Sequence, residues 1–286
     1  MVKLVETDID SYVASLQQDG QSLIFSQDIW WRQVRPFFFR PLLGFLSCGE
    51  AKVAPCWQAR LGGFQYPVDV DSAKNSRLGF LVFRCPGDYT LDSLRGSRRW
   101  EVRNAAKRFE LRAFGSAEEF AELAHPVYRD FQTRTHYGYR SDRRQYEHFM
   151  TWSRQMWQSG GSNIWGAFEG DQLEGVGVFR LAQGTLFYSS FFGRTTGIKN
   201  HVAGFMLHRI REAAARYPGI SRIVVGSPKL DQASRTVDQF YLSRGCDIEW
   251  VPARLELNPI TRRLLRLAKP GLIAQLEGAE MTRDQQ

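Results

Sequence analysis

The chain has 286 residues, of which 43% are hydrophobic and 13% aromatic. This is enough apolar surface for a sizeable core, so the composition predicts a folded protein rather than a disordered one. The formal net charge is +8, and arginine, which suits bidentate binding of phosphate and carboxylate groups, is more common than lysine. We therefore expect an anionic partner, such as a phosphorylated cofactor, an RNA or an acidic membrane surface.

The beginning of the chain is acidic and lacks the basic and apolar runs of a secretory signal peptide. No stretch approaches the roughly 20 apolar residues that span a bilayer. The four cysteines are scattered and form no close pairs, which argues against a disulfide framework or a zinc site. Asp69 and Asp71 have no nearby His or Cys, so we interpret them as part of a turn and predict no metal site. These features predict a reduced, cytoplasmic protein.

Residues 1–97 differ in character from the rest of the chain and are interpreted as an N-terminal extension. Residues 25–32 predict a short helix that carries Trp30 and Trp31. Residues 36–46 are apolar but are interrupted by two prolines and an arginine. Two interpretations stay open for them: a hairpin in the core or between domains, and an anchor at a membrane interface.

From residue 98 the predicted elements follow one another regularly. Ser116 followed by Glu119 is a capping box, which marks the start of a helix. In chain order we predict a basic helix over 98–108, a strand over 109–114, helices over 116–135 and 141–159, strands over 163–168, 173–181 and 185–192, a helix over 201–217, a strand over 220–226, a helix ending near 245, and a last strand over 248–256.

Two short motifs stand out in this part of the chain. The first, Arg194-Thr195-Thr196-Gly197-Ile198-Lys199-Asn200, lies between an aromatic strand and a long helix. Small residues and positive potential before a helix N-terminus are typical of an anion site. The second motif is Phe240-Tyr241-Leu-Ser-Arg-Gly245-Cys246, at the end of the next helix.

The order of elements and the two motifs resemble the GNAT (Gcn5-related) N-acyltransferase superfamily, including its FemAB-like branch. The resemblance implies an α+β fold with a central, mostly antiparallel mixed sheet flanked by helices. It covers a GNAT-like domain over residues 98–258, after the extension over 1–97, which is interpreted as a reduced GNAT-like unit. Residues 259–286 follow as a basic amphipathic helix and tail.

The resemblance assigns the first motif to coenzyme A. The family pattern is Gln/Arg-x-x-Gly-x-Gly/Ala, which Arg194 and Gly197 match, while Lys199 stands at the last small position and can itself meet a phosphate. The cofactor-binding residues that it implies are Arg194, Thr195, Thr196, Gly197, Ile198, Lys199 and Asn200, with acetyl-CoA or another acyl-CoA as co-substrate and no metal.

The resemblance assigns the second motif to catalysis, with Tyr241 as the acid that protonates the leaving thiolate. Cys246 has no His or Asp partner in the sequence and is not predicted as a nucleophile. Glu174 and Glu169 are the nearest candidates in the sequence for a base that takes a proton from an amine acceptor. Surface carboxylates on strands and turns are also common.

Acceptor binding is expected in two places. The loop that carries His136, Tyr137, Tyr139 and Arg140 lies where GNAT proteins build the acceptor pocket. On the strand from Thr185, Tyr188 and Ser190 are predicted to share one face and to line the acyl channel.

Three functions follow as hypotheses. The first is transfer of an acyl group from acyl-CoA to a small-molecule or cell-envelope-precursor amine by direct attack. The second is a FemAB-like transferase that uses aminoacyl-tRNA, with the basic helix 98–108 on the phosphates. The third is a non-catalytic module that binds an anionic membrane surface through residues 36–46 and 260–269, a contact that is also compatible with an enzyme.

Overall fold

A computed structural model describes residues 3–49, 52–84, 86–136, 138, 140–228 and 235–277. The chain folds into two units, which we call unit 1 and unit 2, and each is assembled from several segments. Unit 1 consists of Met1–Asp19, Leu81–Gly226 and Thr236–Asp247, and unit 2 of Gly20–Phe80, Ser227–Arg235 and Ile248–Gln286. The units are therefore discontinuous, and their limits do not coincide with the predicted boundaries at residues 97 and 258.

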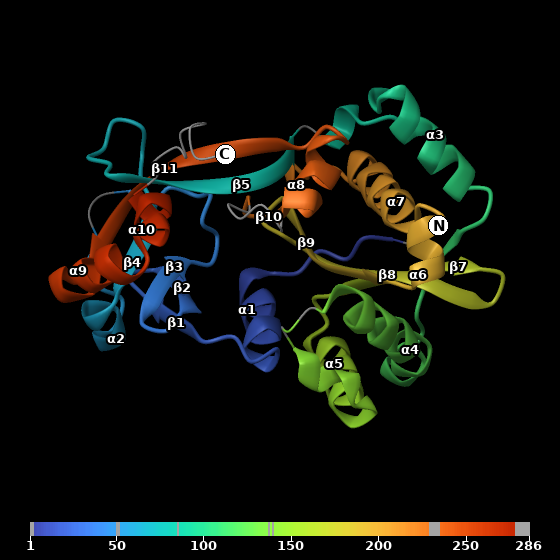
Figure 1. Ribbon diagram of the computed structural model, residues 1–286, viewed down its shortest axis with the longest axis horizontal. Coiled ribbons are helices and arrows are strands. Elements are labelled where there is room, and N and C mark those ends of the chain that lie inside the picture. The colour runs from blue at the N-terminus through green and yellow to red at the C-terminus, as the bar shows by residue number, and fades with distance from the viewer. Residues whose placement is uncertain are drawn as a thin grey trace. The chain divides into compact units, whose positions relative to one another are not determined.

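Unit 1 is built on a mixed sheet in which the described strands follow the order β5-β10-β9-β8-β7-β6 (Figure 1). All neighbouring strands are antiparallel except β9 and β10, which are parallel. The strands are β5 (Ser76–Arg84, of which Leu81–Arg84 belong to unit 1), β6 (Glu110–Ala113), β7 (Asn163–Glu169), β8 (Gln172–Ala182), β9 (Thr185–Gly193) and β10 (Arg222–Gly226). This arrangement confirms the predicted fold class.

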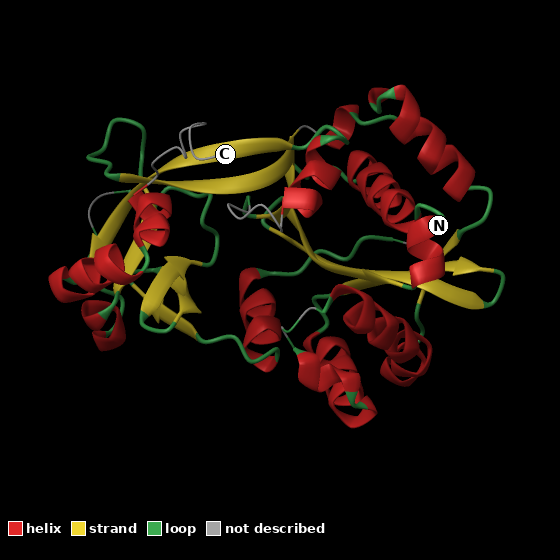
Figure 2. Ribbon diagram, in the orientation of Figure 1, coloured by secondary structure: helices red, strands yellow, loops and turns green. Residues whose placement is uncertain are grey.

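Helices cover both faces of this sheet (Figure 2). One apolar cluster contains Phe179, Leu186 and Met206 and lies between the sheet and α7, and the other contains Phe120 and Val176 and lies under α4 and α5. The helices of unit 1 are α1 (Ile9–Gln18), α3 (Gly96–Ala105), α4 (Ala117–Thr135), α5 (Tyr146–Ser159), α6 (Thr195–Lys199), α7 (Val202–Arg216) and α8 (Arg235–Leu242), with 3-10 turns at Pro86–Asp88, Leu91–Ser93 and Ser141–Arg144.

The predicted helix start at Ser116 is confirmed, but only one half of the capping box forms, because the Glu119 carboxylate accepts from the Gly115 backbone N–H and not from that of Ser116. The Ser116 hydroxyl accepts a hydrogen bond from the Glu119 backbone N–H at 3.1 Å, and α4 begins at the next residue. The other helices and strands predicted between residues 98 and 258 are also present, with ends that differ by a few residues. The exception within this stretch is α6, an additional short helix where the sequence predicts a loop.

Unit 2 contains the described strands β1 (Leu23–Ser26), β2 (Ile29–Arg35), β3 (Phe38–Pro41), β4 (Gly63–Pro67) and β11 (Asp247–Leu257), in that order across the sheet. Its helices are α2 (Trp57–Leu61), α9 (Pro259–Ala268) and α10 (Pro270–Glu277). The predicted basic helix that stops before Pro270 is confirmed as α9, but Pro270–Glu277, which the sequence predicts as part of a tail, form the helix α10. Among the described residues, every helix is too short or too polar to cross a bilayer.

The helix predicted over residues 25–32 is wrong, because this stretch is a β-hairpin. Gln27 and Asp28 both have positive φ angles, 57° and 61°, which suit the two-residue turn that joins twisted antiparallel strands. Trp31 is fully buried against Phe64 and Tyr66, whereas its neighbour Trp30 packs on Phe25. Side chains that alternate in this way follow the period of a strand.

Candidate active site

The predicted anion loop after β9 is largely helical. Arg194 precedes α6, and the chain then turns at His201, whose φ is 66°, before α7 begins. The backbone N–H groups of Ile198 and Asn200 donate to carbonyl oxygens of this same turn. The N–H groups that an external anion would meet are therefore those at the starts of α6 and α7, which have no acceptor within their own helices.

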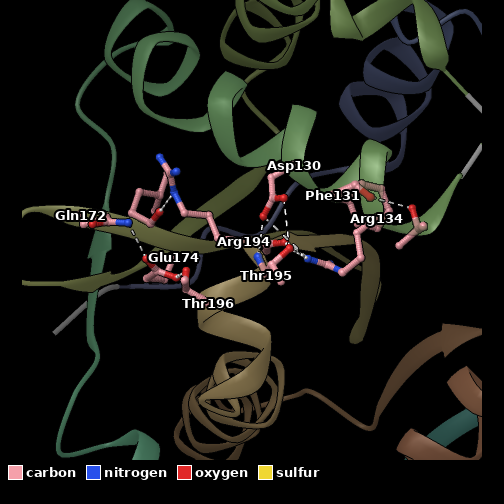
Figure 3. Close-up of polar contacts among 11 residues, drawn as sticks. Asp130, Phe131, Arg134, Gln172, Glu174, Arg194, Thr195 and Thr196 are labelled. Atoms are coloured by element: carbon pink, nitrogen blue, oxygen red, sulfur yellow. Dashed lines mark hydrogen bonds and ion pairs between the residues drawn. The ribbon is translucent and has the colours of Figure 1, made fainter.

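A carboxylate of the protein itself lies at the start of α6. Both oxygens of Asp130 are used: Oδ2 accepts from the Thr195 backbone N–H and Oδ1 accepts from the Thr195 hydroxyl at 3.1 Å (Figure 3). Arg134, one turn along α4, donates to the Gly193 carbonyl at 3.0 Å and to the Thr195 hydroxyl at 3.2 Å. A negative charge is stabilised at a helix N-terminus, and Asp130 supplies that charge here.

Glu174 lies on β8 against α6 and is only 3% exposed. Its Oε2 accepts from the Thr196 hydroxyl at 2.6 Å and its Oε1 accepts from the Gln172 side-chain amide at 2.8 Å (Figure 3). A Cβ atom at Gly197 would lie 2.8 Å from both the carbonyl oxygen and Oε2 of Glu174, so this approach requires a glycine. These contacts describe a carboxylate that holds α6 against the sheet.

Glu169, the other candidate base, is the last residue of β7, and its side chain is 40% exposed. It forms an ion pair with Arg108 at 2.9 Å. Lys199 is exposed on the outer side of α6.

The strands β9 and β10 are paired only over their first residues. The parallel ladder joins Thr185–Phe187 to Arg222–Val224 and ends there. Directly after Phe187, β9 also carries a bulge against β8, since Tyr188 lies opposite Phe179 while Ser190 lies opposite Val178.

The bulge corrects one prediction. Phe179 and Val178 are neighbours in one strand and point to opposite faces, so their partners Tyr188 and Ser190 do so too. The prediction that Tyr188 and Ser190 share one face is therefore wrong, because one extra residue in β9 shifts the alternation. Tyr188 joins the apolar cluster under α7, and Ser190 is exposed.

Tyr188 and Tyr241 lie in the same apolar cluster. Tyr188 is 8% exposed, and its hydroxyl has no hydrogen-bond partner among the described residues. Burial raises the pKa of Tyr188 well above its ordinary value, and burial followed by the nearby Cys246 and Asp238 raises the pKa of Tyr241 to about 12. Both phenols are therefore neutral near pH 7 and available as hydrogen-bond donors.

Cys246 is buried, and this burial raises the pKa of its thiol to about 12. The thiol is therefore protonated near pH 7, which does not favour a nucleophile. Among the described residues, no group of three or more His, Cys, Asp or Glu side chains is placed to hold a metal ion.

The predicted acceptor loop follows α4, which ends at His136 with a φ of 51°. The Arg140 carbonyl accepts from the Tyr128 hydroxyl at 3.0 Å, and the Arg140 guanidinium donates to the backbone carbonyl of Asp19 at the end of α1. Tyr137 and Tyr139 lie outside the described residues.

Asp130 and Arg134 are residues of this region that the sequence analysis misses. They stand four positions apart and therefore share one face of α4. That spacing is visible in the sequence, but their contact with Thr195 joins positions about 60 residues apart, which no local pattern predicts.

No model of a protein family matches the chain, and no curated protein matches it by sequence. Solved structures do match. FemX superposes with a TM-score of 0.56 over 90% of this chain and 93% of its own, at 9% identity. The C-terminal DUF2156 domain of a proposed lysylphosphatidylglycerol synthetase from Agrobacterium fabrum gives 0.55 over 95% and 94%, at 8% identity. L-PGS from Bacillus licheniformis gives 0.51 over 97% and 99%, at 10% identity.

The fold is that of the GNAT-like acyltransferases, in the FemAB-like form. The resemblance predicted from the order of elements is thus confirmed at the level of the fold. Each of these matches extends over nine-tenths or more of the chain, so the shared fold includes segments of both units.

Proposed function

We propose that the protein is an acyltransferase, in which an amine acceptor directly attacks the carbonyl of an activated acyl donor. The observation that carries this proposal is the end of the β9–β10 ladder at Phe187, beside the neutral phenols of Tyr188 and Tyr241. Backbone N–H groups of β9 beyond this point would polarise the donor carbonyl and stabilise the negative charge that develops on its oxygen. Tyr241 would then give its proton to the leaving group.

Two features support an aminoacyl ester, as in aminoacyl-tRNA, over an acyl-CoA thioester as the donor. Asp130 already binds the backbone N–H and the hydroxyl of Thr195, in the loop that the family motif assigns to the pyrophosphate of coenzyme A. In addition, the alkoxide released from an ester is far more basic than a thiolate. It therefore takes a proton more readily from a phenol whose pKa is about 12.

The similar structures support the same choice. A lysylphosphatidylglycerol synthetase, by its name, joins a lysyl group to phosphatidylglycerol, and one proposed protein of this kind matches over 95% of the chain. Acyl-CoA stays the second candidate donor, because Arg194 and Gly197 keep their places in the coenzyme A motif.

The exposed face of α9 favours an enzyme that acts at a membrane surface. Ile260, Leu264 and Leu267 stand at successive turns of one face of α9 and are exposed by 71%, 60% and 77%. Arg263 on the same helix and Lys269 at its C-cap are also exposed, so an apolar stripe is flanked by positive charge. This combination fits an anionic bilayer surface. The acceptor would then be a lipid or a cell-envelope precursor at that surface.

The donor is tested with two probes and one readout. The purified protein is incubated with a pool of aminoacyl-tRNA or with acetyl-CoA, each labelled in the acyl group, and with hydroxylamine as a surrogate amine. We expect enzyme-dependent formation of the hydroxamate from aminoacyl-tRNA, and a slower rate with Tyr241→Phe. Consumption of acetyl-CoA instead would establish the second donor, and turnover of neither would refute the acyltransferase proposal.

A further inference from the structure

Arg180 is a charged side chain that is buried without an ion pair to any carboxylate of the described residues. It lies on β8 and is only 3% exposed. Its Nη1 atom donates to the Ser189 hydroxyl at 3.4 Å, a long hydrogen bond. Among the described residues, its Nε atom has no hydrogen-bond partner. A guanidinium has five N–H donors, and burial makes each one that is left unpaired costly.

The other buried arginines of unit 1 are compensated. Arg244 is 6% exposed and forms an ion pair with Glu101 at 2.7 Å. Arg211 is 8% exposed, donates to the Arg244 carbonyl at 2.6 Å and lies 3.7 Å from the centroid of the Tyr89 ring. Arg180 has no comparable partner in the described part of the chain, although its charge is buried at least as deeply.

The surroundings of Arg180 lead to the surface at one point. Arg180 lies opposite Phe187 in the β8–β9 ladder, and the Phe187 ring stacks on Tyr12 of α1 with centroids 5.3 Å apart. Ser189, which accepts the hydrogen bond from Arg180, lies in the bulge of β9 and is exposed. The guanidinium is thus next to a hydroxyl that solvent and ligands can reach.

The charge around this position is positive. Asp19 forms an ion pair with Arg143 at 2.6 Å, and Arg140 donates to the Asp19 backbone carbonyl. Arg143 in turn lies 4.2 Å from the centroid of the Trp152 ring. Arg180 also interacts electrostatically with Asp19, so three arginines gather near one aspartate, whose charge is already paired with Arg143.

We propose that Arg180 and Ser189 form a binding site for an anionic group, a carboxylate or a phosphate, of the acceptor substrate. The planar guanidinium can bind two oxygens of such a group at once, and the Ser189 hydroxyl can donate to it. The acceptor assignment rests on the proposed function. Arg140, from the loop expected to recognise the acceptor, and Arg180 both lie near Asp19, which supports it.

The test uses Arg180→Met, which keeps the length of the side chain and removes its charge. The control is Arg211→Met, another buried arginine that already has protein partners. Melting temperatures are measured for both variants and for the wild-type protein in sodium chloride, sodium phosphate and sodium acetate at equal ionic strength. General salt effects on stability act on all three proteins alike, so the difference between proteins reports the site.

We expect a bound anion to raise the melting temperature of the wild-type protein and of Arg211→Met but not of Arg180→Met. In chloride, Arg180→Met should melt no lower than the wild-type protein, because an uncompensated buried charge has been removed, while Arg211→Met should melt lower. The larger rise, with phosphate or with acetate, identifies the anion.

The proposed site would be overturned if an anion raises the melting temperature of Arg180→Met as well. It would also be overturned if neither anion raises the melting temperature of the wild-type protein. Neither measurement needs turnover, so the result is independent of the hydroxylamine assay. Anion binding through Arg180 without any transfer would leave this site intact and remove the proposed function. Transfer without anion binding would leave the proposed function intact and remove the anion site.

Discussion

Tyr241 shows how burial limits the role of a titratable side chain. Its ring packs edge-on against Phe83 with centroids 6.4 Å apart, and this apolar setting is the main reason that its pKa is raised to about 12. The phenol therefore stays protonated through the physiological range. It can act as a proton donor to a strongly basic leaving group, and it cannot act as a base near pH 7.

Replacing Tyr241 with Phe should lower the rate constant of transfer by about 100-fold, the lower end of the usual contribution of a general acid. The apparent affinity for the donor should be unchanged, because the proton is needed only in the transition state. Single-turnover kinetics with the labelled donor measure both quantities. Tyr89→Phe is the control, since Tyr89 is buried too but is hydrogen-bonded to His208. An unchanged rate in Tyr241→Phe would remove Tyr241 from catalysis.

The contacts of Glu174 indicate a structural role rather than that of a general base. Both of its oxygens accept hydrogen bonds, from Gln172 and Thr196. In Glu174→Gln one oxygen acceptor becomes an amide donor, so the bond to the Gln172 amide or to the Thr196 hydroxyl is disturbed. We expect the free energy of unfolding to fall by about 1–3 kcal/mol and the transfer rate to change less than tenfold. Urea unfolding and single-turnover kinetics check the two parts, and unchanged stability with a rate about 100-fold lower would identify Glu174 as the base instead.

At the scale of elements, α9 carries a prediction about the membrane. Leu264 and Leu267 are 60% and 77% exposed, so Leu264→Asp and Leu267→Asp together should leave the melting temperature nearly unchanged. The double variant should lose binding to vesicles that contain anionic phospholipid, measured by flotation, because its apolar stripe is interrupted. Val70→Asp, at another residue of unit 2 that is 70% exposed, is the matched control and should still bind.

Vesicles of neutral phospholipid complete this experiment. Weak binding to them is expected, because the basic residues beside the stripe, such as Arg263, attract anionic headgroups. If the wild-type protein fails to float with anionic vesicles, or if the double variant floats equally well, α9 is not the membrane contact.

Elements whose signals are local are predicted well from the sequence. The start of α4 follows from Ser116, whose hydroxyl accepts a hydrogen bond from the backbone N–H of Glu119, three residues later. The hairpin at Gln27 and Asp28 is missed because neither residue is a glycine, although both adopt positive φ angles. The bulge in β9 leaves no mark on the sequence, where the aromatic and polar residues continue without a gap.

The candidate site depends still more on contacts between distant residues. Its two motifs could be identified from the sequence, whereas the roles of Asp130, Arg134 and Arg180 could not. In the sequence, Asp130 resembles any acidic residue on the surface of a helix. Its contact with α6 is made to Thr195, which lies 65 positions further along the chain. Arg180 lies within a predicted strand, and only the fold shows that its charge is buried without an ion pair among the described residues.

For the molecule as a whole, the buried acids of unit 1 predict how stability changes with pH. Burial raises the pKa of Cys246 from 9.0 to about 12, and it raises the pKa values of Tyr89 and Tyr241 from 10.0 to about 12. Between the ordinary and the raised values, the folded state holds protons that the unfolded state has released. These three groups therefore lower the free energy of unfolding as the pH rises, starting near pH 9.

Cys246→Ala tests this dependence at one position. Losing the side chain lowers stability by a similar amount at every pH, but it also removes one group that holds its proton on folding. Urea titrations between pH 8 and about pH 11 measure the free energy of unfolding of both proteins. Above pH 9, this free energy should therefore decline less steeply for the variant than for the wild-type protein. The difference should approach about 1.4 kcal/mol for each pH unit above that point. Two parallel curves would mean that the Cys246 thiol titrates in the folded protein as it does in the unfolded chain, and the apolar cluster beside Tyr241 would then be open to water.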